Sequence, residues 1–116
     1  MWSQVNKFTP MPNYPKVERK LAAIMFTDIV GYTEQMSKDQ DAAFFLLEEK
    51  QSKLKPLIKE NNGKLIKEMG DGTLSYYPTA IDASKCSVEL QKLIKDNDKL
   101  NVRVGIHLGD TTFKDG

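Results

Sequence analysis

Residues 26–33 read Phe-Thr-Asp-Ile-Val-Gly-Tyr-Thr, and residues 67–72 read Lys-Glu-Met-Gly-Asp-Gly. In the first stretch Asp28 stands where an apolar run gives way to a glycine turn, and in the second Asp71 lies in the tight turn of an expected hairpin. An aspartate at the mouth of a buried strand is costly unless something binds it. Together the two stretches therefore predict a pair of carboxylates that hold metal ions.

The segments around the first stretch have the periodicity of a strand and a helix. The apolar run Leu21 to Ile29 predicts a central strand that ends at Asp28. Ser37, with Gln40 three residues later, has the pattern of a capping box and predicts a long helix that ends at the Asn-Gly pair 62–63. Its lysines and glutamates are expected on a solvated face. The positions expected to face inward are Phe44, Leu47, Gln51, Leu54 and Ile58.

The second stretch predicts a hairpin followed by another helix. Residues 64–69 and 73–77 have strand character, and the intervening Gly-Asp-Gly favours a tight turn with Asp71 at its tip. Pro78-Thr79 followed by Asp82 predicts a helix start, and the Asp-Asn-Asp run at 96–98 predicts its end. The residues expected to be buried on this helix are Ala83, Cys86, Leu90, Leu93 and Ile94.

The last periodic segment, residues 102–108, alternates apolar residues with Arg103, Gly105 and His107, which predicts a strand with one apolar face. The order strand, helix, strand, strand, helix, strand predicts an α+β fold in which helices cover one face of a ferredoxin-like antiparallel sheet. Residues 19–116 form the expected domain. Residues 1–18 contain three prolines and are expected to be an extended arm or linker.

The composition limits the kinds of partner and compartment. A chain of 116 residues, 40% hydrophobic and 28% charged, fits a single domain. Lys and Arg total 17 against 16 for Asp and Glu, so a formal charge of +1 gives no electrostatic case for a nucleic-acid or membrane partner. Cys86 is the only cysteine, which excludes an internal disulfide. With no signal segment and no apolar run long enough to cross a bilayer, we expect a cytoplasmic location.

From Arg19 onward the chain resembles the N-terminal part of the class III nucleotidyl cyclase catalytic domain, the adenylate/guanylate cyclase family. Three motifs carry the resemblance and follow in order at family-like separations: Phe-Thr-Asp-Ile-Val-Gly-Tyr-Thr, Lys-Glu-Met-Gly-Asp-Gly and Arg-Val-Gly-Ile-His-Leu-Gly. The resemblance implies a reaction in which the ribose 3′-oxygen of a nucleoside triphosphate attacks its own α-phosphorus. Pyrophosphate leaves, and a 3′,5′-cyclic monophosphate remains.

The resemblance also implies roles for single residues. Asp28 and Asp71 match the family's catalytic metal ligands, and the backbone carbonyl of Ile29 matches a further ligand. The implied cofactors are two Mg²⁺ or Mn²⁺ ions per active site, which suit hard oxygen ligands. Arg103 corresponds to the family's arginine on the terminal phosphate, a role suited to a fork of donors. The positions that match the turn facing the triphosphate are Gly31, Tyr32 and Thr33.

Each of these residues also has a plainer interpretation. Asp28 could cap the helix after its strand, and Asp71 could serve only to favour the turn. Arg103 on a polar strand face could simply be solvated. His107 is the only histidine and has no histidine or cysteine at metal-ligand spacing, so we interpret it as structural.

Base selection is expected to depend on Lys67. In the family this position resembles an adenine-reading site when it is lysine and a guanine-reading site when it is glutamate. A lysine donates to the acceptor N1 of adenine, whereas a glutamate accepts from guanine. Lys67 therefore points to ATP. Glu68 should face the other side of its strand because side chains alternate.

Family members continue past the last residue of this chain with an Asp that reads adenine, an Asn that orients the ribose and an Arg that stabilises the transition state. We therefore expect the 116-residue chain alone to be inactive. The resemblance implies a homodimer with active sites at the interface, in which one protomer supplies the metal aspartates and the other supplies the Lys, Asn and Arg.

Three functions remain open at this stage. The first is an adenylate cyclase, with a guanylate cyclase as its variant. The second is a non-catalytic nucleotide- or partner-binding module that keeps the cyclase fold. The third is another two-metal enzyme on a related palm, such as a diguanylate cyclase, although the Gly-Asp-Gly turn at 70–72 lacks the glycine-glycine-acid-acid pattern of that family.

Overall fold

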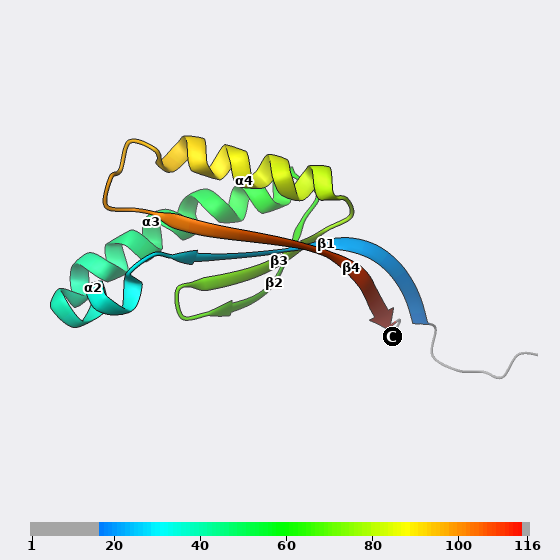
Figure 1. Ribbon diagram of the computed structural model, residues 1–116, viewed down its shortest axis with the longest axis horizontal. Helices are drawn as coiled ribbons and strands as arrows, with labels where there is room; N and C mark the ends of the chain where they lie inside the picture. The colour runs from blue at the N-terminus through cyan, green and yellow to red at the C-terminus, as the bar shows by residue number, and fades with distance from the viewer. Residues whose placement is uncertain (1–16, 115–116) are drawn as a thin grey trace, which may run out of the picture.

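The computed structural model describes residues 17–114, with side chains described for residues 21–110. Four strands form one antiparallel sheet in the order β2-β3-β1-β4. Helices α3 and α4 lie side by side over one face of this sheet (Figure 1). The predicted α+β, ferredoxin-like arrangement is confirmed. In chain order the elements are β1 (Val17–Ile29), α2 (Tyr32–Lys38), α3 (Gln40–Glu60), β2 (Lys64–Met69), β3 (Gly72–Tyr77), α4 (Ala80–Ile94) and β4 (Val102–Lys114).

Strand β1 is central and longer than the sequence predicted. It pairs with β3 over residues 23–27 and with β4 over its whole length, from Val17 opposite Lys114 to Ile29 opposite Val102. Residues 17 and 18, which the sequence placed in the arm, therefore belong to the strand. The rest of the expected arm, residues 1–16, lies outside the described residues. Beyond α4 the far ends of β1 and β4 continue together as a curved two-stranded ribbon (Figure 1).

The start of the long helix is one correction to the sequence analysis. Ser37 does not cap it, because Ser37 lies inside the short helix α2 and donates its hydroxyl to the backbone oxygen of Glu34. Asp39 is the N-cap of α3, and its carboxylate accepts the backbone N–H of Ala42 at 3.1 Å. The predicted end of the helix is confirmed, since α3 stops at Glu60 before the Asn-Gly pair.

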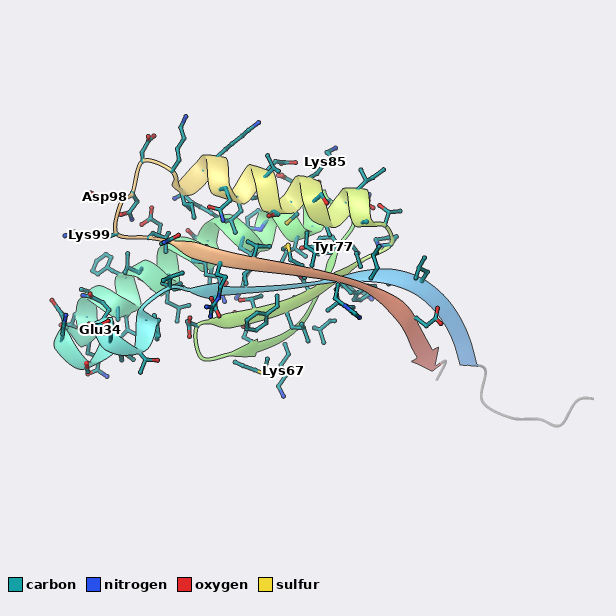
Figure 2. All side chains as sticks on the ribbon, viewed as in Figure 1. Glu34, Lys67, Tyr77, Lys85, Asp98 and Lys99 are labelled. Atoms are coloured by element: carbon teal, nitrogen blue, oxygen red, sulfur yellow. The ribbon has the colours of Figure 1, made fainter. Side chains whose placement is uncertain are left out.

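The core lies between the sheet and the two long helices. Tyr77 of β3 is fully buried and lies between the sheet and α4 (Figure 2), with its hydroxyl hydrogen-bonded to Ser75 and to the Cys86 sulfur at 3.0 and 3.3 Å. Cys86 is buried, as the sequence predicted. Gly63 passes so close to the Tyr77 ring that an added Cβ would overlap it. The buried cluster is completed by Ala23, Met25, Ile29, Leu54, Leu57, Ile58, Ala83, Leu90, Ile94, Leu100 and Val102.

Several residues expected to be buried are exposed instead. Leu93 is 53% exposed and Phe44 is 45% exposed. On both α4 and α3 the apolar residues cover a wider arc of the helix than the face that is buried against the sheet. On β4 the apolar face is covered only at its start. Val102 is buried, whereas Ile106 and Leu108 are 40% and 51% exposed as the strand leaves the helices. In the described part of the chain, none of the helices is long and apolar enough to cross a membrane.

Candidate active site

The two aspartates singled out by the sequence lie at the same end of the sheet. Asp28 is the penultimate residue of β1, and Asp71 lies in the turn between β2 and β3. Because β3 is the neighbour of β1, the hairpin turn comes to rest beside the end of β1. The backbone N–H of Ile29 donates to Asp71 Oδ2 at 2.8 Å, which fixes the hairpin tip against the strand. The pairing of Asp28 and Asp71 in space is therefore a property of the fold.

The chain turns sharply after β1 at Gly31. Its backbone angles, φ 75° and ψ 15°, are in the left-handed region, where glycine is favoured over residues with a Cβ. An added Cβ would meet nothing within 4 Å, so the backbone angle and not the available space calls for glycine here. The turn leads directly into α2, whose first residues are Tyr32 and Thr33.

Arg103 lies opposite Asp28 in the β1–β4 pairing and forms an ion pair with it. Its Nε donates to Asp28 Oδ1 at 3.1 Å, and a terminal guanidinium nitrogen donates to Oδ2 at 2.6 Å. This two-point contact matches the fork of donors to the carboxylate. The hydrogen bonds that Arg103 donates to Asp28, and the negative charge of that carboxylate, raise the pKa of Arg103, so the guanidinium is charged throughout the accessible pH range.

These residues line one pocket of about 370 Å³ at the end of the sheet. Predicted site residues from the strand end, the turn and β4 thus meet in one place. The complete lining is Asp28, Ile29, Val30, Gly31, Tyr32, Thr33, Glu34, Asp71 and Arg103. Lys67 is the one predicted site residue that is not part of it.

Lys67 lies on the opposite side of the sheet from the helices. Its neighbour Glu68 accepts a hydrogen bond from Gln51 and forms a 3.1 Å ion pair with Lys55, both on α3, so Glu68 faces the helices as expected. Lys67 is exposed and points away from the helices (Figure 2). A register shift between Leu65 and Lys67 interrupts the β2–β3 pairing just before it.

Sequence reasoning missed Val30 and Glu34, which also line the pocket, and a buried lysine behind it. Lys50, in the middle of α3, was assigned to a solvated face, yet its side chain is fully buried behind the site. Its ammonium donates to the backbone oxygens of Asp71 and Thr27, at 2.6 and 3.2 Å, and to Thr73 Oγ1 at 3.3 Å. Burial lowers the pKa of Lys50 to about 8, although nearby carboxylates act in the opposite direction. Its spacing from Ala43, Leu54 and Leu57 on the buried stripe of α3 was the available signal.

The two aspartates and the Ile29 carbonyl fit an open Mg²⁺ site better than a site in which protein side chains supply all the ligands. Among the described residues, no group of three or more His, Cys, Asp or Glu side chains could hold a metal. Mg²⁺ is commonly held by one or two carboxylates together with substrate phosphates and water. Two aspartates and a neighbouring backbone carbonyl, open to a pocket, meet that description. His107 on β4, opposite Ile24, lies outside this pocket.

Comparison with known proteins is consistent with this geometry. A sequence model of the family described as adenylate and guanylate cyclase catalytic domain matches residues 15–114. The chain is 32% identical over 107 residues to a Rhizobium meliloti (strain 1021) protein named "Putative adenylate cyclase 3", a match that covers 85% of this chain and 18% of that protein. It is 30% identical over 106 residues to the Myxococcus xanthus "Serine/threonine-protein kinase pkn2", which covers 84% of this chain and 13% of the kinase.

Solved structures give the same assignment of the fold. The crystal structure of an adenylate/guanylate cyclase/hydrolase from Silicibacter pomeroyi superposes with a TM-score of 0.74 at 28% identity, covering 86% of this chain and 63% of that one. The adenylyl cyclase CyaB from P. aeruginosa gives 0.70 at 21% identity, over 84% and 60% of the two chains. The chain belongs to the adenylate and guanylate cyclase catalytic domain family. It spans less than a fifth of the two sequence relatives.

Proposed function

We propose that this chain contributes to an adenylate cyclase, a lyase that converts ATP to 3′,5′-cyclic AMP and pyrophosphate. The supporting observation is that Asp28 of β1, Asp71 of the β2–β3 turn and Arg103 of β4 meet around one pocket beside the Gly31 turn. The family to which the chain belongs includes cyclases of both nucleotide types. The preference for ATP rests on Lys67.

In this proposal the two aspartates and the Ile29 carbonyl hold Mg²⁺ or Mn²⁺. When bound there, the ions lower the pKa of the ribose 3′-hydroxyl and neutralise charge on the phosphates. The residues of the chain set the position of the ligands. The 2.8 Å bond from the Ile29 N–H fixes one carboxylate oxygen of Asp71, whose residue lines the pocket.

Arg103 has two competing acceptors in this scheme. Without nucleotide it forms a two-point pair with Asp28. Its side chain is 71% exposed, so the guanidinium can leave Asp28 and bind the terminal phosphate of ATP. We propose that Arg103 exchanges one anion for the other when substrate binds, which frees Asp28 as a metal ligand.

Lys67 supports the proposal of a dimeric enzyme. It does not line the Asp28 and Asp71 pocket, and it is exposed on the side of the sheet away from the helices (Figure 2). In the proposed arrangement, a lysine there reads adenine at the metal site of a second copy of the chain. A homodimer whose active sites lie at the interface would supply this arrangement.

The deciding experiment is turnover of ATP and GTP to cyclic nucleotide with Mn²⁺ by the full-length natural protein. Loss of a residue that merely supports a metal ligand typically lowers activity by about 10- to 100-fold. Asp71→Asn alters a proposed ligand itself, so it should lower ATP turnover by more than that. The matched control Asp98→Asn, in the exposed loop after α4, should leave turnover unchanged. Lys67→Glu should shift the preference toward GTP, since glutamate accepts from guanine.

The alternatives give different results in the same assay. A guanylate cyclase would prefer GTP with Lys67 intact. A non-catalytic module would turn over neither nucleotide, and Asp71→Asn would then change only metal-dependent nucleotide binding. The cytoplasmic location remains a prediction from the sequence.

A further inference from the structure

Lys50 is a buried lysine with all three of its donors engaged. A lysine ammonium carries three N–H groups, and the three acceptors of Lys50 are the backbone oxygens of Thr27 and Asp71 and the hydroxyl of Thr73. The side chain is fully buried beneath the sheet. The remaining buried positions of α3, apart from Lys50, are apolar. Burying a charged group is costly unless its partners compensate for it, so this position needs an explanation beyond packing.

The positions of the acceptors supply that explanation. Thr27 directly precedes Asp28, and the other backbone acceptor is that of Asp71 itself. Lys50 therefore ties together the main chain at both proposed metal ligands, from an element that belongs to neither strand. The Ile29 N–H bond to the Asp71 carboxylate makes a second tie between the same two segments.

We propose that Lys50 is a positioning residue that sets the separation of Asp28 and Asp71 required for binding a divalent cation. This inference rests on the proposed function. Outer partners that orient metal ligands affect metal affinity even though they do not touch the metal. Lys50 would orient the two ligands in this way, by holding backbone oxygens beside them and not by contacting their carboxylates.

Electrostatics and positioning predict opposite effects when Lys50 is replaced. Removing a positive charge next to a cation site strengthens Coulombic attraction for the cation. Removing the tie lets the two carboxylates separate and weakens cation binding. A purely structural lysine would change the stability of the fold but would not weaken Mn²⁺ binding by the folded protein.

The test is Mn²⁺ binding followed by the EPR signal of the free ion, with the full-length natural protein. Lys50→Met should weaken Mn²⁺ affinity by about tenfold. Lys53→Met serves as the matched control, because Lys53 lies on the same helix and forms a partly exposed 3.6 Å ion pair with Glu49. Its Mn²⁺ affinity should equal that of the unchanged protein.

The outcomes separate the inference from the proposed function. Equal or tighter Mn²⁺ binding by folded Lys50→Met, while Asp71→Asn abolishes binding, would overturn the role of Lys50. If Asp71→Asn binds Mn²⁺ as tightly as the unchanged protein, the proposed metal site itself is wrong. If Lys50→Met does not fold, Lys50→Gln decides in its place. The glutamine NH2 group still donates hydrogen bonds, but the side chain is too short to bridge the backbone oxygens of Thr27 and Asp71. Undiminished Mn²⁺ affinity in Lys50→Gln would equally refute the inference.

Discussion

The Arg103 guanidinium and the Asp28 carboxylate neutralise each other at the mouth of the pocket. Because Asp28 gives both oxygens to Arg103, at 3.1 and 2.6 Å, a cation must compete with the guanidinium for the same carboxylate. We predict that Arg103→Met binds Mn²⁺ about threefold to tenfold more tightly in the absence of nucleotide. The KM for ATP should rise at the same time, because the phosphate donor is lost. Mn²⁺ titration and initial rates measure the two effects.

Arg103→Lys is the control for this prediction. A lysine keeps the charge but cannot make the two-point contact. Its Mn²⁺ affinity should therefore lie between those of the unchanged protein and Arg103→Met. Weaker Mn²⁺ binding by Arg103→Met would contradict the competition between the guanidinium and the cation.

Tyr77 gives the protein an alkaline limit of stability. Burial raises the pKa of Tyr77 above its ordinary value of 10.0, and burial likewise raises the pKa of Cys86 above 9.0. The folded state thus favours the neutral forms. Their contribution is complete below about pH 9 and is lost as pH rises, because the unfolded chain gives up these protons first. Tyr77→Phe should show a shallower loss of stability between about pH 9 and pH 11 in urea unfolding. Parallel pH profiles for the two proteins would contradict this account.

Sequence reasoning identified most residues of the pocket but did not identify Lys50. The aspartates were visible because acids are rare at the end of an apolar strand. A lysine on a helix rich in lysine and glutamate is not unusual for its surroundings, so residue type alone does not single it out. Its burial depends on the helix phase relative to the sheet, and the exposed Phe44 shows that this phase was misjudged.

At the scale of the element, the break between α2 and α3 depends on Asp39. Its carboxylate accepts the Ala42 N–H, and one of the first unpaired donors of α3 is satisfied in this way. We predict that Asp39→Ala lowers the free energy of unfolding by about 0.5–2 kcal/mol. Ser37→Ala should change it little, because Ser37 is exposed within α2. Urea unfolding of the two variants distinguishes the two capping assignments.

The connection from α3 to β2 depends on the missing side chain of Gly63. A Cβ there would overlap the Tyr77 ring and come within 2.9 Å of the Ile58 backbone oxygen. Gly63→Ala should therefore cost about 1–3 kcal/mol of stability through overpacking. Gly105→Ala is the matched control, since a Cβ at Gly105 would meet nothing within 4 Å. Equal urea midpoints for the two variants would show that the Tyr77 ring can move aside.

At the scale of the whole molecule, the proposed dimer predicts complementation. Asp71→Asn should inactivate the metal side of a site, and Lys67→Ala should inactivate the base-reading side. If each site draws on two protomers, half of the dimers in an equal mixture carry both variants, and each of these has one intact site. The mixture should therefore recover up to about one quarter of the activity of the unchanged protein. Cyclic AMP formation after co-expression measures this recovery. No recovery from chains shown to associate would contradict shared sites.

Sequence reasoning also captured the order of the four strands and the two long helices, but not the separate short helix α2 or the lengths of the strands. The alternation at 102–108 identified β4, and the tight turn at Gly70 and Asp71 identified the hairpin. The ends of β1 and β4 were missed because their pairing is long-range. Residues 17–20 acquire strand structure only from the partner strand opposite them, and local patterns do not report such partners.

The continuous pairing of β1 with β4 has a mechanical consequence. The strand that ends beside Asp28 is the same strand whose other end runs out beyond the helices (Figure 1). A pull along β1 loads the interstrand hydrogen bonds in shear and shares the force among them. The outer ribbon and the two ends of the Asp28–Arg103 ion pair thus lie on the same two continuous strands, without a chain break between them.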